Sequence, residues 1–177
     1  MKTKNIERYL ESFGKQVVNR AKGNLQKAKK GGSLENSIKF EVITTDDGFT
    51  VQFYMDSYGT FVDKGVSGTK TKRTFKDYKG KTISSPYSYK NSTGHSQPPS
   101  KALDKWVVKK GIAPRDASGK FMKRKTITFL IARSIGKKGI QGISFFQKPL
   151  GLGLKQFGKD LLGNVKEDII NSLTTVK

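Results

Sequence analysis

Few residues of this 177-residue chain have the type and spacing that catalysis requires. The chain contains no cysteine, which excludes disulfides, thiolate metal sites and cysteine nucleophiles. Its single histidine, His95, lies in a polar stretch of serine, glycine and glutamine, and no second histidine accompanies it as a metal ligand. We therefore expect His95 to be a solvated loop residue rather than a catalytic base.

Two aspartates, Asp56 and Asp63, have a spacing that would suit a metal-binding carboxylate pair in a nuclease. No third acidic ligand lies near them in the sequence, so we expect helix capping or surface ion pairs instead. Gly151 and Gly153 lack the third glycine and the strand–turn–helix setting of a dinucleotide-binding loop. The sequence thus predicts a protein that is not an enzyme, with no catalytic residue, metal site or cofactor.

The most unusual chemical property of the chain is its formal net charge of +21 at pH 7. Such an excess indicates an anionic partner: nucleic acid, an acidic protein surface or an anionic membrane. The basic surface that we predict consists of Lys70, Lys72, Arg73, Lys76, Lys79, Lys81, Lys120, Lys123, Arg124, Lys125, Lys137 and Lys138. Aromatic residues lie among the first cluster, which suits contact with phosphates or acidic side chains: Phe75, Tyr78, Tyr87 and Tyr89. A solvated surface without a partner is the alternative.

The positive charge is concentrated in the middle of the chain. Residues 1–63 carry 10 basic and 8 acidic side chains, and residues 149–177 carry 4 and 3. Residues 64–148 carry 21 basic and 3 acidic side chains, a net charge of +18. We therefore expect the two ends to form a charge-balanced core and the middle to face something negative.

Hydrophobic periodicity predicts the elements of that core. The first is an amphipathic helix that stops at Gly31-Gly32, because apolar residues recur every three or four positions. Its apolar stripe consists of Ile6, Leu10, Phe13, Val17, Ala21 and Leu25. Two alternating strands at about 37–55, joined by the turn residues 46–48, predict a β-hairpin. A closing amphipathic helix is expected at about 153–173.

The middle of the chain has no periodicity over residues 67–97, which are basic and rich in serine, threonine and glycine. So long a loop is uncommon unless it is functional or disordered, and we expect a contact arm. Pro98-Pro99-Ser100 predicts the start of a helix that continues to Lys110. The inner face of that helix is expected to contain Leu103, Trp106 and Val107, with the tryptophan packed rather than stacked on a base. A second short helix is expected from Lys123 to Ile135.

These elements predict an α+β fold, a small antiparallel sheet built on the hairpin and packed by the N- and C-terminal helices. The expected core comprises residues 1–66 and 140–177. The basic insertion comprises residues 67–139, an extended arm plus two short helices. The N-terminus has no signal-peptide pattern and no apolar run is long enough to cross a bilayer, so we expect no membrane partner.

Several short motifs occur in a recognisable order. A Gly-Ser-Leu-x-x-Ser-Ile step spans Gly32 to Ile38, and a Tyr-x-x-Phe-Val-Asp-x-Gly stretch spans Tyr58 to Gly65. Ser134-Ile135 and Gly139-Ile140 follow the insertion, and a Phe-Phe-x-x-Pro-Leu step spans Phe145 to Leu150. This order resembles the tail-completion and head–tail joining (neck) proteins of tailed bacteriophages, minor tail proteins included.

The resemblance implies a compact subunit that forms a six- or twelve-fold ring of identical copies at the neck, where the head joins the tail. It implies portal, adaptor or tail proteins as partners, together with nonspecific contact with packaged DNA. It also implies synthesis in the host cytoplasm and a final location in the virion. The long basic insertion departs from the shorter members of the family and leaves the position within the neck open.

Two other functions compete with a neck protein. A monomeric or dimeric nucleic-acid-binding protein would bind DNA with micromolar or tighter affinity that falls steeply with salt. A small phage nuclease would depend on a divalent metal ion and on Asp63. A neck subunit would bind DNA weakly and without sequence preference.

Overall fold

The computed structural model describes residues 4–30, 32–90 and 96–174, and the chain divides into two compact units. Unit 1 consists of residues 1–63, 76–82 and 143–177, and unit 2 consists of residues 64–75 and 83–142. The expected boundaries, 66/67 and 139/140, lie within three residues of the observed ones. The segment 76–82 differs from the expectation, because it belongs to unit 1 rather than to the insertion.

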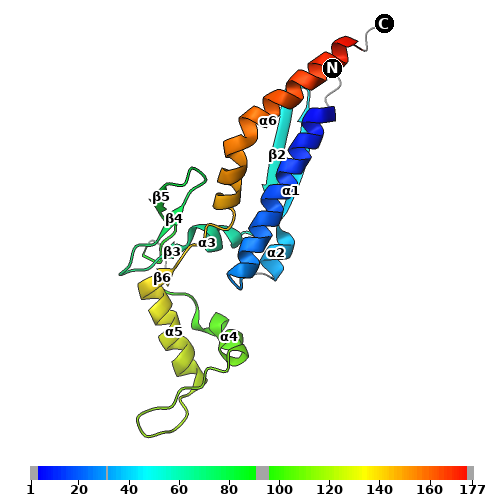
Figure 1. Cartoon of the computed structure of the whole chain (residues 1–177). Coiled ribbons are helices and arrows are strands. Elements are labelled where there is room, and N and C mark those ends of the chain that lie inside the picture. Colours follow the sequence, from blue (N-terminus) through cyan, green and yellow to red (C-terminus); the bar gives the residue numbers. More distant parts are fainter. Residues whose placement is uncertain (1–3, 31, 91–95, 175–177) are drawn as a thin grey trace. The chain divides into compact units, whose positions relative to one another are not determined.

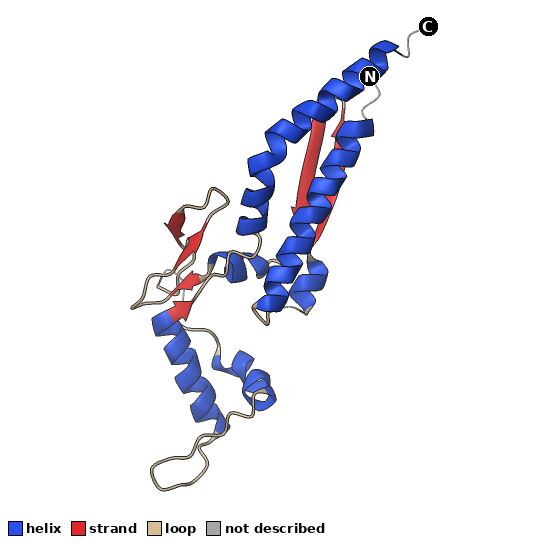
Figure 2. Cartoon of the chain, in the orientation of Figure 1, coloured by secondary structure: helices blue, strands red, loops and turns tan. Residues whose placement is uncertain are grey.

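Unit 1 contains two long helices and a β-hairpin (Figures 1 and 2). The helices are α1 (Lys4–Lys27) and α6 (Gln147–Thr174), and the hairpin is formed by β1 (Lys39–Thr45) and β2 (Gly48–Tyr54). Helix α1 packs against both α6 and β1. The predicted α+β class and the hairpin at 37–55 are therefore confirmed. Two short helices, α2 (Ser33–Ser37) and α3 (Gly59–Lys64), precede and follow the hairpin.

The hairpin turns one face toward the helices. In its antiparallel register Phe40 lies opposite Phe53 and Val42 opposite Val51, so large apolar side chains alternate onto the same face. Phe40 and Phe53 pack against the buried core. The next pair in the register, Glu41 and Gln52, is exposed to solvent. Gly14 lets α1 approach this face closely, because a Cβ there would overlap the ring of Phe40.

The centre of the core lies where α1, α2 and the segment before α6 meet. Leu25, Leu34, Ile38 and Phe145 are each at most 2% exposed and belong to one hydrophobic cluster. Phe145 is fully buried although it follows a loop, and its backbone carbonyl accepts a hydrogen bond from the Asn24 side chain of α1 (3.2 Å). The segment that leads into α6 is therefore fixed to the core before the helix begins.

Two buried aspartates hold the beginnings of the two long helices. Asp168 of α6 accepts hydrogen bonds from the backbone N–H groups of Asn5 (3.3 Å) and Ile6 (3.1 Å) in the first turn of α1. Asp63 of α3 accepts one from the backbone N–H of Phe146 (2.8 Å), at the start of α6. Both carboxylates satisfy donors that a helix leaves unpaired at its N-terminus, and their charge suits the helix dipole.

Helix α6 begins at Gln147, six residues earlier than predicted, and runs through its glycines without a break. Contacts with other parts of unit 1 explain two of these glycines. A Cβ at Gly151 would overlap the carbonyl oxygen of Tyr78, and a Cβ at Gly153 would lie 2.7 Å from the ring of Phe13. These glycines therefore permit close packing within unit 1, which offsets their low helix propensity.

Unit 2 is built from short elements. Its strands are β3 (Val66–Ser67), which pairs with β6 (Gly139–Ile140), and most of the β4–β5 hairpin (Thr74–Lys76 and Thr82–Ser84). Its helices are the 3₁₀ turn η1 (Ser100–Leu103), α4 (Asp104–Lys109) and α5 (Arg124–Lys138).

The expectation of an extended arm over residues 67–97 is wrong for its described part. Ser67 donates its N–H to the carbonyl of Tyr87 (2.8 Å) and accepts the N–H of Tyr89 (2.9 Å), so two stretches of the supposed arm are tied together. The strands β4 and β5 lie between them. Sequence patterns missed these strands because each has only three residues, too few for alternation to be recognised.

The helices of unit 2 enclose a small core. Val107 of α4 and Ile127 and Ala132 of α5 are each at most 6% exposed, and α5 contacts η1 and α4. The prediction that Trp106 packs inward is wrong, because its side chain is 44% exposed. The tight 3₁₀ turn before α4 changes the angular spacing of side chains, and Val107 instead of Trp106 points inward.

Candidate functional site

The predicted basic residues do not form one continuous cluster. One group lies in unit 2 around the C-terminal end of α5: Lys70, Lys72, Arg73, Lys137 and Lys138. A second lies before and within the first turn of α5: Lys120, Lys123, Arg124 and Lys125. The 15 residues of α5 separate these groups by about 20 Å along its axis. The third group, Lys76, Lys79 and Lys81, lies in unit 1.

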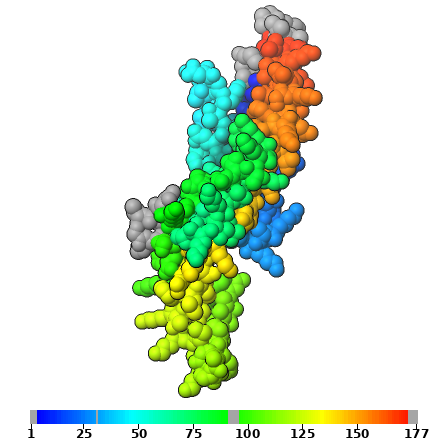
Figure 3. Space-filling model, turned by 90° about the vertical axis from the view of Figure 1, so that its left-hand side faces the viewer, coloured from blue at the N-terminus to red at the C-terminus, as the bar shows by residue number. Residues whose placement is uncertain are grey.

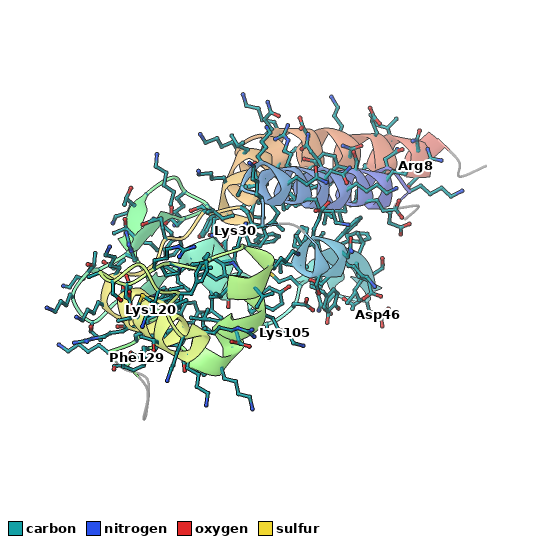
Figure 4. All side chains as sticks on the ribbon, turned by 90° about the horizontal axis from the view of Figure 1, so that it is seen from below. Arg8, Lys30, Asp46, Lys105, Lys120 and Phe129 are labelled. Carbon is teal, nitrogen blue, oxygen red and sulfur yellow. The ribbon has the colours of Figure 1, made fainter. Side chains whose placement is uncertain are left out.

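Unit 2 nevertheless carries most of the charge excess. It contains 17 lysines and arginines but only two carboxylates, a net charge of +15, whereas the rest of the chain contains 18 and 12, a net charge of +6. Figure 4 shows nitrogen-tipped side chains, among them Lys105 and Lys120, extending around the helices of this unit. In Figure 3 its side chains protrude from the yellow and yellow-green surface. Unit 2 therefore has a strongly cationic surface.

The loop that carries the first group is fixed to the C-terminal end of α5. The backbone N–H groups of Thr69 and Lys70 donate to the carbonyls of Gly136 (2.8 Å) and Lys137 (3.1 Å). The Arg73 Nε donates to the carbonyl of Lys138 (2.8 Å). These bonds satisfy carbonyls that the helix leaves unpaired. Arg73 is thus occupied by a structural contact.

A polar pocket of about 340 Å³ opens beside this loop, entirely within unit 2. Its lining residues are lysines, hydroxyl residues and one glycine: Ser67, Gly68, Thr69, Lys70, Thr71, Lys72, Ser84, Ser85, Ser88 and Lys90. No carboxylate is among them. The sequence prediction included Lys70 and Lys72 but missed Lys90 and the serines, because the β4–β5 hairpin brings them to the loop.

The second group is held by a structured turn. Asp116 accepts hydrogen bonds from the Ser118 hydroxyl (2.7 Å) and from the backbone N–H groups of Ser118 and Lys120 (both 3.0 Å). The Ser118 hydroxyl, followed by the Lys120 backbone, lowers the pKa of Asp116 below its ordinary value of 3.8. Arg115 lies over the ring of Phe121 at 3.9 Å. The loop before α5 is thus a small ordered projection of unit 2.

The aromatic residues expected on the arm differ in their accessibility. Phe75 is only 6% exposed, so its predicted role in a contact surface is wrong. Tyr87 and Tyr89 are half-buried, and burial raises the pKa of Tyr89. Tyr78 is 43% exposed, with Lys79 over its ring at 5.6 Å, and it lies in unit 1. Of the four residues only Phe75 lies in a strand, at the centre of β4, and three residues are too few for its burial to be predicted from alternation.

The candidate carboxylates have structural roles. Helix capping and surface ion pairs were the roles expected of these aspartates. Asp63 caps α6, and Asp56 accepts a hydrogen bond from the Ser33 hydroxyl (3.3 Å). In the part of the chain that the structure describes, no three metal-ligating side chains lie close enough to bind an ion. His95 lies outside the described residues. Among the described helices, none has both the length and the apolar composition needed to cross a bilayer.

An acidic segment was overlooked in the sequence. Residues 33–63, which include the β1–β2 hairpin, carry six carboxylates and one lysine, a net charge of −5. The carboxylates of Glu41, Asp46 and Asp47 are exposed on the hairpin, and Figure 4 labels Asp46 at its turn. Averaging the charge over the whole of residues 1–63 concealed this segment, because residues 1–32 carry nine basic residues.

The chain matches no protein-family model, no curated protein and no solved structure. Its function therefore has to be argued from its own residues and their geometry.

Proposed function

We propose that this protein is a structural component of a tailed-phage particle that assembles into a ring at the neck, joining the head and portal to the tail, and that it has no enzymatic activity. The observation that carries the proposal is the convergence of three motifs far apart in the sequence. Leu34, Ile38 and Phe145 belong to one core cluster. The carboxylate of Asp63 caps the helix that begins just after Phe145. Three of the motifs that carry the resemblance thus meet in unit 1, whereas Ser134-Ile135 and Gly139-Ile140 lie in unit 2.

The distribution of charge supports contacts between identical copies. The acidic segment 33–63 and the cationic unit 2 belong to the same chain. The acidic segment of one copy can therefore contact unit 2 of the next copy. Such a contact joins two different surfaces, and repeated around an axis it closes a ring. Complementary charge would set the register of neighbours and speed their encounter.

Exposed apolar residues on α6 support assembly as well. Leu162 is 72% exposed and Leu152 is 54% exposed, although both lie on a helix whose other side packs on α1. Ile169 and Ile170 are 44% and 47% exposed. Exposed apolar residues in such number on one helix are typical of a surface that is covered in an assembly.

The decisive experiment looks for rings in two settings. Native mass spectrometry of the purified protein should show a closed oligomer of six or twelve copies, and mass spectrometry of purified virions should detect the chain in stoichiometric amount. High salt should dissociate the oligomer, because the proposed contact is electrostatic. A protein that stays monomeric at high concentration and is missing from virions contradicts the proposal.

A pair of variants tests the contact between copies. Asp46→Asn with Asp47→Asn removes two charges from the hairpin turn while keeping turn-forming residues, and should raise the concentration needed for ring formation several-fold. Glu7→Gln with Glu11→Gln removes the same charge from α1, outside both the acidic segment and α6, and should have little effect. Equal effects of the two pairs would show that only the net charge matters.

A further inference from the structure

The polar pocket of unit 2 contains the donor groups that bind phosphate. Lys70, Lys72 and Lys90 contribute three ammonium groups, and threonine and serine hydroxyls lie between them. Lysine, serine and threonine side chains are among the usual contacts of DNA phosphate oxygens. The hydroxyls of Ser67 and Ser88 each accept a backbone N–H within the unit, so they are held in place and can still donate to an anion. The Ser85 hydroxyl already donates to the carbonyl of Gly65 (2.7 Å).

The pocket is shaped before any ligand arrives. Its loop is tied to the end of α5 through Thr69, Lys70 and Arg73, as described above. Gly68 lies so close to the carbonyl of Lys137 that a Cβ would overlap it. The opposite wall is fixed because the Ser85 N–H donates to the carbonyl of Arg73 (2.8 Å). A preformed site spends less of its binding energy on ordering.

The pocket also lacks an internal counter-charge. Among the described residues, no carboxylate lies within ion-pair distance of Lys70, Lys72 or Lys90. The two carboxylates of unit 2 are engaged elsewhere: Asp104 pairs with Arg124 (3.3 Å), and Asp116 holds its own turn. The lysine charges are therefore available to an external anion.

We propose that this pocket binds phosphate groups of the double-stranded DNA backbone, without sequence preference. This inference rests on the proposed function, because a neck ring is the setting that brings DNA past every copy. DNA is favoured over an acidic protein because the site is concave and consists of lysines and hydroxyls. The pocket lining contains no arginine, and Arg73 beside it already donates to the carbonyl of Lys138.

The test is the binding of a fluorescein-labelled DNA duplex of about 24 base pairs to the full chain, followed by fluorescence anisotropy at about 50 and 200 mM salt. The pocket variant is Lys70→Gln, Lys72→Gln and Lys90→Gln. We expect it to lower the affinity at the lower salt by about tenfold or more, and to reduce the slope of log affinity against log salt by about two to three. All three side chains are exposed, so the fold should persist, which circular dichroism checks.

A matched variant separates the pocket from the general charge of unit 2. Lys105→Gln, Lys109→Gln and Lys110→Gln removes the same charge from exposed positions of unit 2 outside both the pocket and the predicted basic surface, and should lower the affinity by less than about threefold. An equal loss in the two variants overturns the proposal, since binding would then follow total charge. No loss in the pocket variant overturns it as well.

Two competitors identify the class of ligand. Poly-glutamate stands in for an acidic protein surface, and inorganic phosphate stands in for a small free anion. Each competitor is compared with unlabelled duplex at equal concentration of negative charge. If poly-glutamate or inorganic phosphate displaces the labelled duplex more effectively than unlabelled duplex does, the site is not a DNA-backbone site. The failure of this inference is distinguishable from that of the proposed function, because ring formation and presence in virions are measured without DNA binding.

Discussion

Unit 1 and unit 2 differ in the interactions that stabilise each of them internally. Of the fourteen buried apolar residues of the described chain, ten lie in unit 1 and four in unit 2. Unit 1 adds buried carboxylates that cap its long helices, whereas unit 2 depends on short strands and on a loop bonded to the end of a helix. The net charges of the units are +6 and +15.

This difference separates the residues that stabilise the fold from those that carry most of the positive charge. Burial of apolar area gives unit 1 its stability, and its excess of positive charge is less than half that of unit 2. Unit 2 has little apolar area to bury, and its lysines and arginines repel one another, which opposes its folding. In the function that we propose, this excess positive charge faces an anionic partner. Variants in unit 1 should therefore change folding, and charge variants in unit 2 should change binding.

The largest effect is expected from Phe145→Ala. The side chain is fully buried in the core of unit 1, and its truncation should lower the free energy of unfolding by about 3–5 kcal/mol. Phe129→Ala is the matched control, because Phe129 of unit 2 is 48% exposed and its loss should cost less than about 1 kcal/mol. Urea denaturation followed by circular dichroism gives both values. Similar values would contradict the burial described for Phe145.

The next effect concerns the cap of α1. Asp168→Ala should lower the free energy of unfolding by about 1–3 kcal/mol, because two backbone N–H groups lose their acceptor. Asp160→Ala, at an exposed position of the same helix, should change it by less than about 0.5 kcal/mol. Thermal unfolding measures the difference, and hydrogen exchange should show faster exchange in the first turn of α1. An unchanged first turn would show that Asp168 is not its cap.

Two glycines of α6 should give effects of opposite sign. Gly151→Ala should destabilise unit 1 by about 1–3 kcal/mol, since a Cβ there overlaps the carbonyl of Tyr78. Gly158→Ala should stabilise it by about 0.5–1 kcal/mol, because a Cβ there meets nothing within 4 Å and alanine favours the helix. Melting temperatures of the two variants test this directly. Shifts in the same direction would contradict the packing described for α6.

The smallest effect is a local pH dependence in unit 2. The folded pKa of Asp116 is lowered, so the charged form stabilises the turn at pH values above 3.8, and this contribution is lost as the pH falls through the lowered pKa. The amide resonances of Ser118 and Lys120 should therefore shift together in an NMR titration below pH 4. Ser118→Ala removes the strongest cause and should raise the pKa of Asp116. A midpoint that does not move would contradict this assignment.

The sequence predicted the elements whose hydrophobic pattern and turn residues lie within one continuous segment. Helix α1 and the β1–β2 hairpin follow from an apolar stripe and from two alternating strands around an Asp-Asp-Gly turn. The start of α6 was not predictable, since its cap comes from Asp63, 83 residues before the N–H that it accepts. The strands β4 and β5 were too short to show a pattern.

The candidate site was predictable in its chemistry but not in its arrangement. Counting charges located the cationic middle of the chain and named Lys70 and Lys72, which line the pocket. Lys90 and the Ser84–Ser85 pair reach that pocket only because a hairpin reverses the chain between residues 76 and 82. The same hairpin places Lys76, Lys79 and Lys81 in the other unit, which no local pattern indicates.

The bond between Asp168 and the first turn of α1 joins residues 162 positions apart, and it has a consequence for biosynthesis. In a nascent chain emerging from the ribosome, the first turn of α1 lacks this cap until residue 168 has left the exit tunnel, whereas residues 64–142 leave it earlier. Unit 2 can therefore fold before the first turn of α1 is capped.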